Sequence, residues 1–466
     1  MSEELRKREQ LKERIEFSVS TASRHPHPAN AYDPLAHRYK KNYIHPTRWW
    51  LHLEVGAMPL TESIIAYRWR VVQPDGEFEY QVAYNKKVSG IENEQVEVPA
   101  EGQYVIELDI ELDDGRSLTA RREFHLYDFL VVAIGDSYFC GEGKPDVPGQ
   151  PSPVVGPLAC NLATFTKFLV EKVHLNVPMK REPQWQEERV HRSYQSGPSQ
   201  AAADLETLAL GVVVTFLNFA RSGATVYEGL LGPRPKDDWT DMGQVEEARR
   251  TVGDRPIDAL LISIGGNDIE FPDRLLDLLR DDLALVGVGG MLGDDELNRK
   301  QEVSEAKKHL DMLPDRLDEL APEVDTLNAK QVYLMEYPIA HFDTINDEGD
   351  IVVSSGCGIF DAPDMDIDGR DAQVIKDSGE KLNHALRKAA QRHGWIMVGG
   401  ITDAFAGHGR CSPDPYFISA EESCKIQGDF AGTMHPNRKG HKAYGECIEK
   451  AIYAYTIAPT IITKRS

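Results

Sequence analysis

The chain has 466 residues, of which 41% are hydrophobic and 27% are charged, a composition typical of a globular protein long enough for two domains. Its formal net charge of −23 at pH 7 disfavours nucleic acid and anionic membrane surfaces as main partners. No apolar run approaches the length of a transmembrane helix, and the charged start Met1–Lys7 leads into no signal-peptide core. By default, we therefore expect a cytoplasmic protein without a membrane span.

The cysteines are too sparse for a disulfide framework, since there are 6 in the whole chain. Cys411 and Cys424 lie in one loop-like stretch, and a bridge between them would indicate an oxidising compartment. The sequence leaves this pairing open.

Residues 1–42 are expected to form an N-terminal arm. They begin with a charged helical pattern and pass into a proline-containing stretch at 24–30 without periodicity, which predicts irregular structure. The histidines of that stretch lack the paired spacing of a metal site and are interpreted as solvated linker residues.

Residues 43–127 contain short segments of alternating hydrophobicity. The clearest are Trp50–Val55, Ile65–Val72 and Tyr104–Leu112, and turns rich in Gly and Asp separate them. This spacing predicts an all-β sandwich with Trp69 in its core. No cluster of titratable side chains stands out, so we interpret the segment as a packing or recognition module.

Residues 128–466 alternate apolar runs with longer amphipathic segments. The runs predict central strands at 129–134, 216–220, 259–264, 331–335 and 395–398. Helical patterns occupy 244–251, 303–320, 371–392 and about 438–458. This order predicts an α/β layer fold around a mainly parallel sheet.

A serine follows the first of these strands. The unbroken apolar run Phe129–Ile134 is ended abruptly by Gly135-Asp136-Ser137. Ligands of open α/β sheets bind beyond the carboxyl ends of the strands, which makes Ser137 the candidate nucleophile. Taken alone, the same tripeptide is equally typical of a turn followed by a helix N-cap.

Two later turns offer donors for an oxyanion. Gly223 follows the strand at 216–220 and has no Cβ to block its backbone N–H, and Asn267 in the turn 265–268 carries a side-chain amide. Each turn alone is typical of an ordinary strand-to-helix connection. Three such turns together with a late histidine indicate an acyl-transfer site.

His435 is the candidate general base. Pro436 is suited to the opening of the last helix, which leaves His435 on the preceding loop, where an imidazole can reach a serine. His441 falls inside that helix and is interpreted as a surface residue.

In this order the residues resemble the SGNH, or GDSL-type, hydrolases. The resemblance covers residues 128–466 and rests on four blocks: Gly135-Asp136-Ser137, Gly223, Gly265-Gly266-Asn267-Asp268 and His435-Pro436-Asn437. It implies an α/β fold in the form of a three-layer αβα sandwich like that of flavodoxin. It also implies Ser137 as nucleophile, His435 as base, and an oxyanion hole made by the N–H groups of Ser137 and Gly223 with the Asn267 amide.

Further blocks are most similar to the actinobacterial secreted esterases, lipases and phospholipases of that family. These blocks are Gly141-Glu142-Gly143, Phe405–His408 and Cys411. The resemblance thus implies a secreted protein, in contrast to the default location. In the N-terminal half, residues 67–69, 74–76, 102–104 and Leu108 resemble the immunoglobulin-like modules of the polycystic-kidney-disease type.

The chain departs from the family pattern at one position. The family usually has an aspartate three residues before the catalytic histidine, and here that position is Gly432. A carboxylate there would orient the imidazole and stabilise its positive charge. Some relatives with this gap use a backbone carbonyl, so the Gly432 carbonyl is the first candidate for the third member, Asp429 the second, and Asp414 a further rival.

Three other features have open interpretations. Asp364–Gly369 begins like a calcium loop, but Ile375 stands where the bidentate glutamate belongs, which favours an acidic loop capping the next helix. The stretch 287–290 has no phosphate-binding spacing and predicts a mobile loop or lid. Arg189, Arg192 and Arg221 would either favour an anionic substrate group or pair with acidic residues.

Taken together, these observations predict a serine esterase without metal or organic cofactor. Its substrates would be esters of lipids, phospholipids or acetylated carbohydrates, cleaved through an acyl-enzyme on Ser137. Because the usual aspartate is absent, an inactive SGNH-fold protein that binds carbohydrate or protein stays an alternative, as does an acyltransferase. The sequence leaves the oligomeric state open.

Overall fold

A computed structural model divides the chain into two units. Unit 1 comprises Met1–His27, Lys40–Phe129 and Ala203–Thr215, and unit 2 comprises Pro28–Tyr39, Leu130–Ala202 and Phe216–Ser466. The structure describes residues 15–24, 31–56, 63–85, 91–153, 160, 164, 177–208, 211–270, 295–354, 357–358, 366–367 and 369–465. Each unit is described by itself.

Unit 1 contains two antiparallel sheets. The first has the order β1-β4-β7, with β1 (Phe17–Thr21), β4 (Trp49–Val55) and β7 (Glu94–Val98). The second has the order β6-β5-β8-β9, with β6 (Glu79–Tyr84), β5 (Ile64–Val72), β8 (Gly102–Leu112) and the first part of β9 (Ser117–Gly135). The short helix α3 (Lys41–Ile44) precedes β4.

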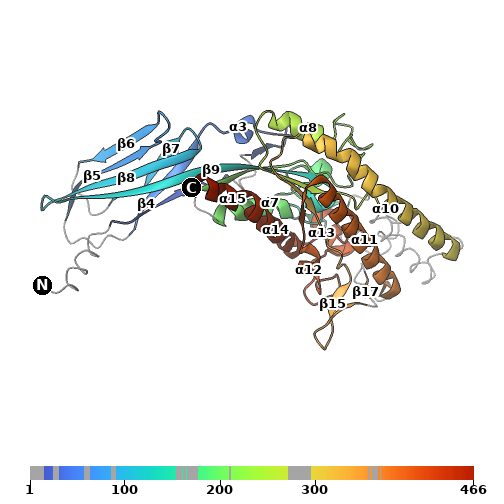
Figure 1. Ribbon diagram of the computed structural model, residues 1–466. Coiled ribbons are helices and arrows are strands. Elements are labelled where there is room, and N and C mark those ends of the chain that lie inside the picture. The colour runs from blue at the N-terminus through green and yellow to red at the C-terminus, as the bar shows by residue number, and fades with distance from the viewer. Residues whose placement is uncertain are drawn as a thin grey trace. The chain divides into compact units, whose positions relative to one another are not determined.

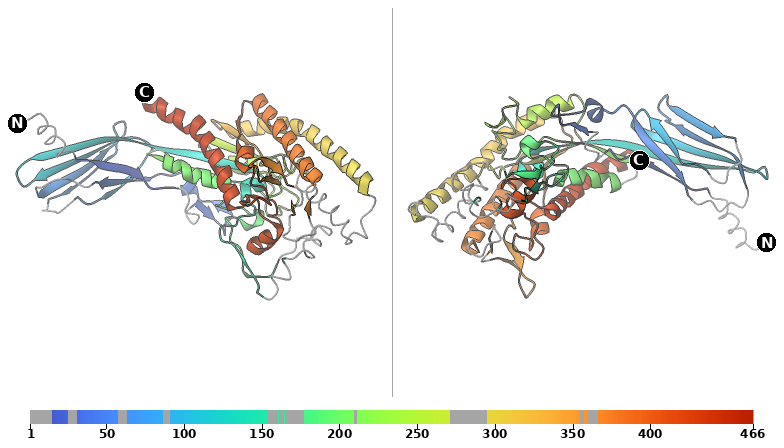
Figure 2. Two further views of the ribbon diagram at one scale, coloured as in Figure 1. Left: turned by 90° about the horizontal axis from the view of Figure 1, so that it is seen from below. Right: turned by 180° about the vertical axis from the view of Figure 1, so that it is seen from behind.

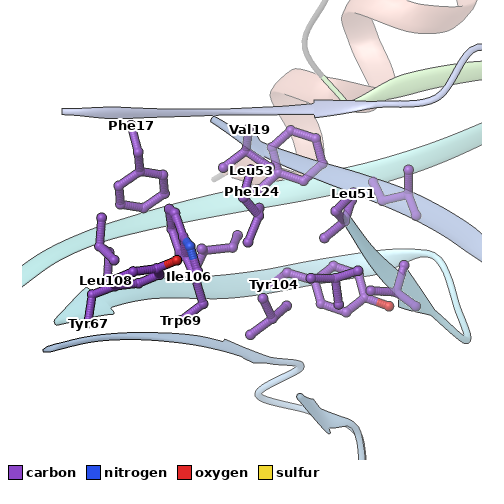
Figure 3. Packing of buried hydrophobic residues seen from close by; sticks show 14 of the residues in the cluster. Phe17, Val19, Leu51, Leu53, Tyr67, Trp69, Tyr104, Ile106, Leu108 and Phe124 are labelled. Carbon is purple, nitrogen blue, oxygen red and sulfur yellow. The ribbon is translucent and has the colours of Figure 1, made fainter. Parts of the chain in front are cut away.

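The hydrophobic core of unit 1 lies around Trp69. Trp69 is completely buried, and the Phe17 ring meets it edge-on with ring centroids 5.2 Å apart (Figure 3). Every second residue of β8 from Tyr104 to Leu112 is also fully buried, which is the period-2 pattern of a strand with one face in a core. The alternation in the sequence thus corresponds to one shared core.

The N-terminal segment differs from the irregular arm that we expected. Phe17–Thr21 forms β1, which pairs with β4 and buries Phe17 and Val19 while Ser18 and Ser20 stay exposed. A strand of five residues inside a charged stretch gives too short an alternation to stand out in the sequence. Residues 28–39 group with unit 2, where β2 (Tyr32–Asp33) and β3 (Arg38–Tyr39) form a small hairpin.

Unit 2 is organised by a parallel sheet in the order β12-β9-β13-β14-β19. These strands are β12 (Val212–Asn218), the last part of β9, β13 (Ala259–Ser263), β14 (Val332–Met335) and β19 (Ile396–Val398). The pairs β9 with β13, β13 with β14 and β14 with β19 are parallel. Numbered along the chain, the order is 2-1-3-4-5, that of flavodoxin-like folds, whose ligand crevice lies where strands 1 and 3 part.

The helices of unit 2 form two packed groups. They are α7 (Gly197–Leu208), α8 (Gln244–Val252), α10 (Asp295–Asp325), α11 (Gly369–His393) and α14 (Arg438–Ile452). α10 and α11 lie against each other, as Figure 1 shows. α7 and α14 approach so closely that a Cβ on Gly197 would lie 2.7 Å from the Tyr444 ring. Right-handed crossovers put α10 and α11 on one face of the sheet and α7 on the other, since the chain crosses the sheet in opposite directions.

The C-terminal helix is interrupted where a single helix to about residue 458 was expected. α14 passes into a π-helical turn at Tyr453–Ile457 and then into α15 (Ala458–Arg465), the red helical run that ends at the C label in Figure 2. The remaining elements of unit 2 are α4 (Ser137–Cys140), β10 (Gln150–Pro151), β11 (Met179–Arg181), a 3-10 turn (Glu188–Val190), β15 (Asp343–Ile345), β16 (Ile351–Val353), β17 (Cys357–Gly358), β18 (Asp366–Ile367), α12 (Ile401–Phe405) and α13 (Ala420–Gln427). No described helix has the length and hydrophobicity needed to cross a membrane.

A disulfide joins Cys160 to Cys424, with Cα atoms 5.6 Å apart. The pairing of Cys411 with Cys424 that the sequence left open is therefore wrong, because Cys424 is bonded to Cys160. Cys411 is itself disulfide-bonded. Cys424 lies on α13 and its partner is 264 residues away along the chain, so nearness in sequence was a poor guide.

Two expectations fall on segments that the structure does not describe. Of the calcium-loop candidate Asp364–Asp368 only the backbone of Asp366–Ile367 is described, and the stretch 287–290 lies wholly outside the described residues.

Candidate active site

Ser137 is the first residue of α4 and follows β9 directly. Asp136 caps this helix, because its carboxylate accepts the Tyr138 N–H at 3.1 Å. The same carboxylate accepts hydrogen bonds from the Ser263 hydroxyl at 3.3 Å and from the Tyr337 hydroxyl. Burial raises the pKa of Asp136 to about 7, against the effect of these hydrogen bonds. Asp136 thus fixes the turn by its hydrogen bonds and so positions the next residue, Ser137, which is 5% exposed.

Gly135 fixes where the strand ends. Its φ of 151° is a backbone conformation that residues other than glycine rarely adopt, and a Cβ would collide with the Ser263 carbonyl oxygen. The fully buried Gln244 side chain accepts the Gly135 N–H at 2.7 Å and donates to its carbonyl at 2.8 Å. The Arg221 N–H donates to that carbonyl at 3.0 Å. Gln244 was not among the expected site residues, since a lone glutamine at a helix start carries no signal in the sequence.

His435 lies on the loop between α13 and α14. Its Nδ1 is 3.2 Å from the Thr433 carbonyl oxygen, which can only accept, so Nδ1 carries the proton. Nε2 is buried and has no hydrogen-bond partner in the described part of the chain. Burial lowers the pKa of His435 below 6.5, and the Glu142 carboxylate opposes this. The imidazole is therefore neutral near pH 7, with Nε2 open to accept a proton.

The loops carrying Ser137 and His435 touch each other. The Tyr138 and His435 ring centroids are 5.3 Å apart. A Cβ on Gly143 would lie 3.4 Å from the His435 Cβ, and one on Gly432 would lie 2.8 Å from the Gly143 Cα. The two glycines thus allow the two loops to pack backbone to backbone. In the described residues no hydrogen bond joins Ser137 to His435, and such contacts often tighten only when substrate binds.

Of the three candidates for the third member, the Gly432 carbonyl acts on the His435 imidazole together with the Thr433 carbonyl and opposes the lowering of its pKa, whereas the two carboxylates have other partners. The Gly432 carbonyl accepts the His435 backbone N–H at 3.0 Å, while the ring nitrogen is hydrogen-bonded to Thr433. Asp429 accepts hydrogen bonds from Gln427 at 2.6 Å and from the Ala431 N–H. Asp414 is paired with Lys439. Within the described residues no carboxylate contacts the His435 ring.

The candidate oxyanion donors come together at the ends of β12 and β13. Gly223 has a φ of 78°, and the Asn267 side-chain amide donates to the carbonyl of the next residue, Ala224, at 2.9 Å. Asp268 accepts the Val226 N–H at 3.2 Å. These bonds tie one turn to the other, and the second amide hydrogen of Asn267 is left for another acceptor.

A network of charged side chains that the sequence did not reveal lies beside His435. His191 Nδ1 is 2.8 Å from the fully buried Glu142 carboxylate, and its Nε2 is 3.7 Å from Asp429. The Gln427 amide donates to both carboxylates. Despite burial of the ring, the Glu142 carboxylate raises the pKa of His191 to about 9, so His191 is a cation. A strained αL residue such as His191, with φ 51°, gives no sequence signal.

In the described chain, the side chains of Glu142, His191 and Asp429 have potential ligand atoms within 4.8 Å of one another, close enough to hold a metal ion. Both ring nitrogens of His191 already face carboxylates, and the Gln427 amide occupies the space between them. This is the pattern of a hydrogen-bonded ion network.

His441 is buried, which corrects its interpretation as a surface residue. Its side chain is 0% exposed and Nε2 lies 3.3 Å from the Glu142 carbonyl oxygen. The face of α14 that carries it packs against the loop after α4, a contact that the helical pattern alone does not reveal.

The three arginines are held inside unit 2. Arg221 pairs with Asp237 and Glu247, and Arg189 with Glu187. All three line a cavity of about 270 Å³ whose lining excludes the candidate catalytic residues. A larger cavity of about 960 Å³, bordered by α10 and α11, excludes them as well.

Comparison with known proteins identifies a family. The model of the GDSL-like Lipase/Acylhydrolase family matches residues 133–443. No curated protein sequence matches the chain.

Solved structures similar to the chain include three hydrolases. An extracellular lipase from Streptomyces rimosus is 21% identical, with a TM-score of 0.42 over 69% of this chain and 99% of the lipase. Phospholipase A1 from Streptomyces albidoflavus is 20% identical, with a TM-score of 0.42 over 69% of this chain and 98% of the phospholipase. A carbohydrate acetylesterase from Sinorhizobium meliloti is 14% identical, with a TM-score of 0.30 over 70% of this chain and 99% of the acetylesterase.

Proposed function

Because the chain belongs to the GDSL-like lipase/acylhydrolase family and unit 2 has the strand order of a flavodoxin-like sheet, we propose that it is a serine esterase acting on carboxylic esters. The observation that carries the proposal is the buried Nε2 of His435, which has no partner among the described residues and lies on a loop packed against the Ser137 loop. A neutral imidazole with a free nitrogen is the form that a general base requires. Lipid, phospholipid and acetylated carbohydrate esters are the proposed substrates.

In the proposed mechanism Ser137 Oγ attacks the ester carbonyl carbon and its proton passes to His435 Nε2. The N–H groups of Ser137 and Gly223 and the Asn267 amide donate to the oxyanion. His435 then protonates the leaving alcohol, and water cleaves the acyl-enzyme with His435 as base again. The Thr433 carbonyl keeps the ring in the required tautomer.

Labelling with a fluorophosphonate tests this proposal directly. The parent is expected to bind the probe stoichiometrically, and Ser137→Ala and His435→Ala to lose labelling. His384→Ala, an exposed change on α11, serves as the control that keeps it. A folded parent that neither reacts with the probe nor hydrolyses p-nitrophenyl esters from acetate to palmitate would overturn the proposal in favour of a binding protein.

We propose a recognition role for unit 1, as an immunoglobulin-like module. Its two antiparallel sheets around the Trp69 core support this role. The disulfide between Cys160 and Cys424 supports export to an oxidising compartment, where such bonds persist.

A further inference from the structure

Two cationic side chains lie in front of Gly223, the turn proposed to bind the oxyanion. The position that a Cβ on Gly223 would take is 3.7 Å from Lys236 Nζ and 3.8 Å from Arg234 NH1. Because Gly223 has no side chain, nothing of its own separates its backbone from these two groups. Any group that occupies the space where a side chain at Gly223 would lie meets both cations.

Arg234 is built into the protein in a fixed orientation. Its side chain is 3% exposed, and its Nε and NH2 donate to one Asp237 oxygen at 2.9 and 2.5 Å. Asp237 is itself fully buried and also pairs with Arg221 at 2.9 Å. The third nitrogen, NH1, forms no hydrogen bond with the described residues and faces Gly223. A guanidinium held by two of its nitrogens thus presents the third to the site.

Lys236 has no hydrogen bond or ion pair with any described residue. Lys236 is an exposed side chain, and partial desolvation together with repulsion from Arg234 lowers its pKa, against the attraction of Glu142 and Asp237. Glu142 is held by His191, and Asp237 by Arg234 and Arg221. The carboxylates of Asp237 and Glu247 are thus taken by Arg221 and Arg234, which leaves Lys236 without a carboxylate partner among the described residues.

We propose that Lys236 Nζ and Arg234 NH1 form a subsite for an anionic group on the ester substrate. A phosphate, sulfate or carboxylate near the scissile carbonyl would accept from the fixed Arg234 NH1 and neutralise the ammonium of Lys236. The enzyme therefore prefers esters that carry a negative charge over neutral esters of the same shape. This inference rests on the proposed esterase function and narrows its substrate class.

Matched pairs of soluble esters test the subsite. One pair carries the charge on the alcohol side, 4-butyryloxybenzoate against its methyl ester, and the other on the acyl side, mono-p-nitrophenyl glutarate against its methyl ester. For at least one pair the parent should have a higher kcat/KM for the anionic ester. The ratio of kcat/KM for the anionic ester to kcat/KM for the neutral ester should fall about fivefold in Lys236→Met and recover in Lys236→Arg. It should also decrease as added salt screens the charges.

The matched control is Lys330→Met. Lys330 is an exposed lysine of unit 2 just before β14, at the opposite edge of the sheet from Ser137. Its removal should leave the ratio unchanged. If Lys236→Met lowered kcat/KM equally for anionic and neutral esters, Lys236 would stabilise the oxyanion of every ester, and the subsite would be overturned. Equal kcat/KM values of the parent within both pairs would overturn it as well.

The source of the anionic group is distinguished by a second comparison. Monomeric dihexanoylphosphatidic acid and dihexanoylglycerol share their acyl chains and differ in the phosphate. A Lys236-dependent preference for the phosphatidic acid identifies a lipid headgroup, whereas the same preference confined to the aryl and glutarate esters identifies a small acid. A parent inert towards all these esters and towards fluorophosphonate refutes the esterase function itself, and a parent active on the neutral esters but indifferent to charge refutes the subsite alone.

Discussion

His435 is oriented by an uncharged acceptor, the Thr433 carbonyl at 3.2 Å. A carbonyl sets the tautomer of the ring as an aspartate would, but it stabilises the imidazolium less than a full negative charge. Burial also disfavours the charged ring, which is why the pKa of His435 is lowered. At the residue scale the consequence is a base that stays neutral into mildly acidic solution.

Hydrolysis of a neutral ester should therefore keep its rate to a lower pH than an ordinary histidine allows. The neutral imidazole is the active form, so kcat/KM should rise with pH through a midpoint below 6.5, the usual histidine value. A pH profile with p-nitrophenyl butyrate measures this midpoint. An acid limb centred above pH 7 would contradict the assignment.

The pair of Glu142 and His191 makes a second prediction at this scale. Interaction with His191 lowers the pKa of Glu142 despite burial, and Glu142 raises that of His191 to about 9. The glutamate contributes stability above its unfolded pKa of 4.5, and the histidine contributes it below 6.5 and loses it as the pH rises through 9. The pair is thus most stabilising between pH 4.5 and 6.5.

Glu142→Gln should lower the free energy of unfolding by about 3 kcal/mol at pH 6, because it leaves a buried cation with one weaker partner. Urea unfolding at pH 6 and pH 9.5 should show a smaller loss at the higher pH. Glu421→Gln, which breaks an exposed pair with Lys425, is the control and should cost less than about 0.5 kcal/mol. An equal loss at both pH values would mean that packing, not charge, is what Glu142 supplies.

At the scale of elements, the loop after α4 and the loop before α14 pack so closely that each limits which side chains the other can carry. Gly432 lies against the Gly143 Cα, the Gln427 side-chain oxygen and the Ser423 hydroxyl, each within 3 Å of where its Cβ would be. The aspartate that relatives are expected to carry at this position has no room here. The carboxylate is therefore missing because the two loops approach each other closely at this position.

Gly432→Asp should fail to complete a triad. The new side chain would push the Gly143 and His435 loops apart, so we expect esterase activity to fall at least about tenfold and the melting temperature to drop. Gly399→Asp is the matched control, because a Cβ there meets nothing within 4 Å. Activity equal to or above that of the parent in Gly432→Asp would show that the loops can move apart without loss.

At the scale of the whole molecule, the two units are not consecutive segments. Ala203–Thr215 lies in unit 1 although the chain on both sides belongs to unit 2. Val213 is part of the unit 1 core, and the Thr215 hydroxyl donates to Asp128 at 2.8 Å. β9 runs without a break from Ser117 to Gly135, through the expected boundary at residues 127 and 128.

A fragment of residues 128–466 should therefore be unstable. It would keep Val213 but lack the strands that bury it, which leaves apolar surface exposed in solution. We expect increased binding of a hydrophobic dye and a lower melting temperature than in the full chain measured beside it. A fragment as stable as the full chain would show that the predicted boundary is a true domain border.

The four blocks of the family resemblance could be recognised in the sequence because each depends on local chemistry. An apolar run followed by Gly135-Asp136-Ser137, the turns at Gly223 and Asn267, and a histidine before a helix that starts near Pro436 are patterns of a few adjacent residues. The same holds for the alternating strands of unit 1. Parallel strands deliver their following turns to one sheet edge, so the α/β order also predicts that these blocks meet.

What only the tertiary structure decided depends on partners far apart in the chain. The bridge from Cys424 to Cys160, the burial of His441 and the cations at Gly223 all arise from packing between elements. Hydrogen bonds and ion pairs act over a few ångströms, and sequence distance does not report such separations. The residues proposed for the chemistry could therefore be named from the sequence, whereas their electrostatic environment was set by the fold.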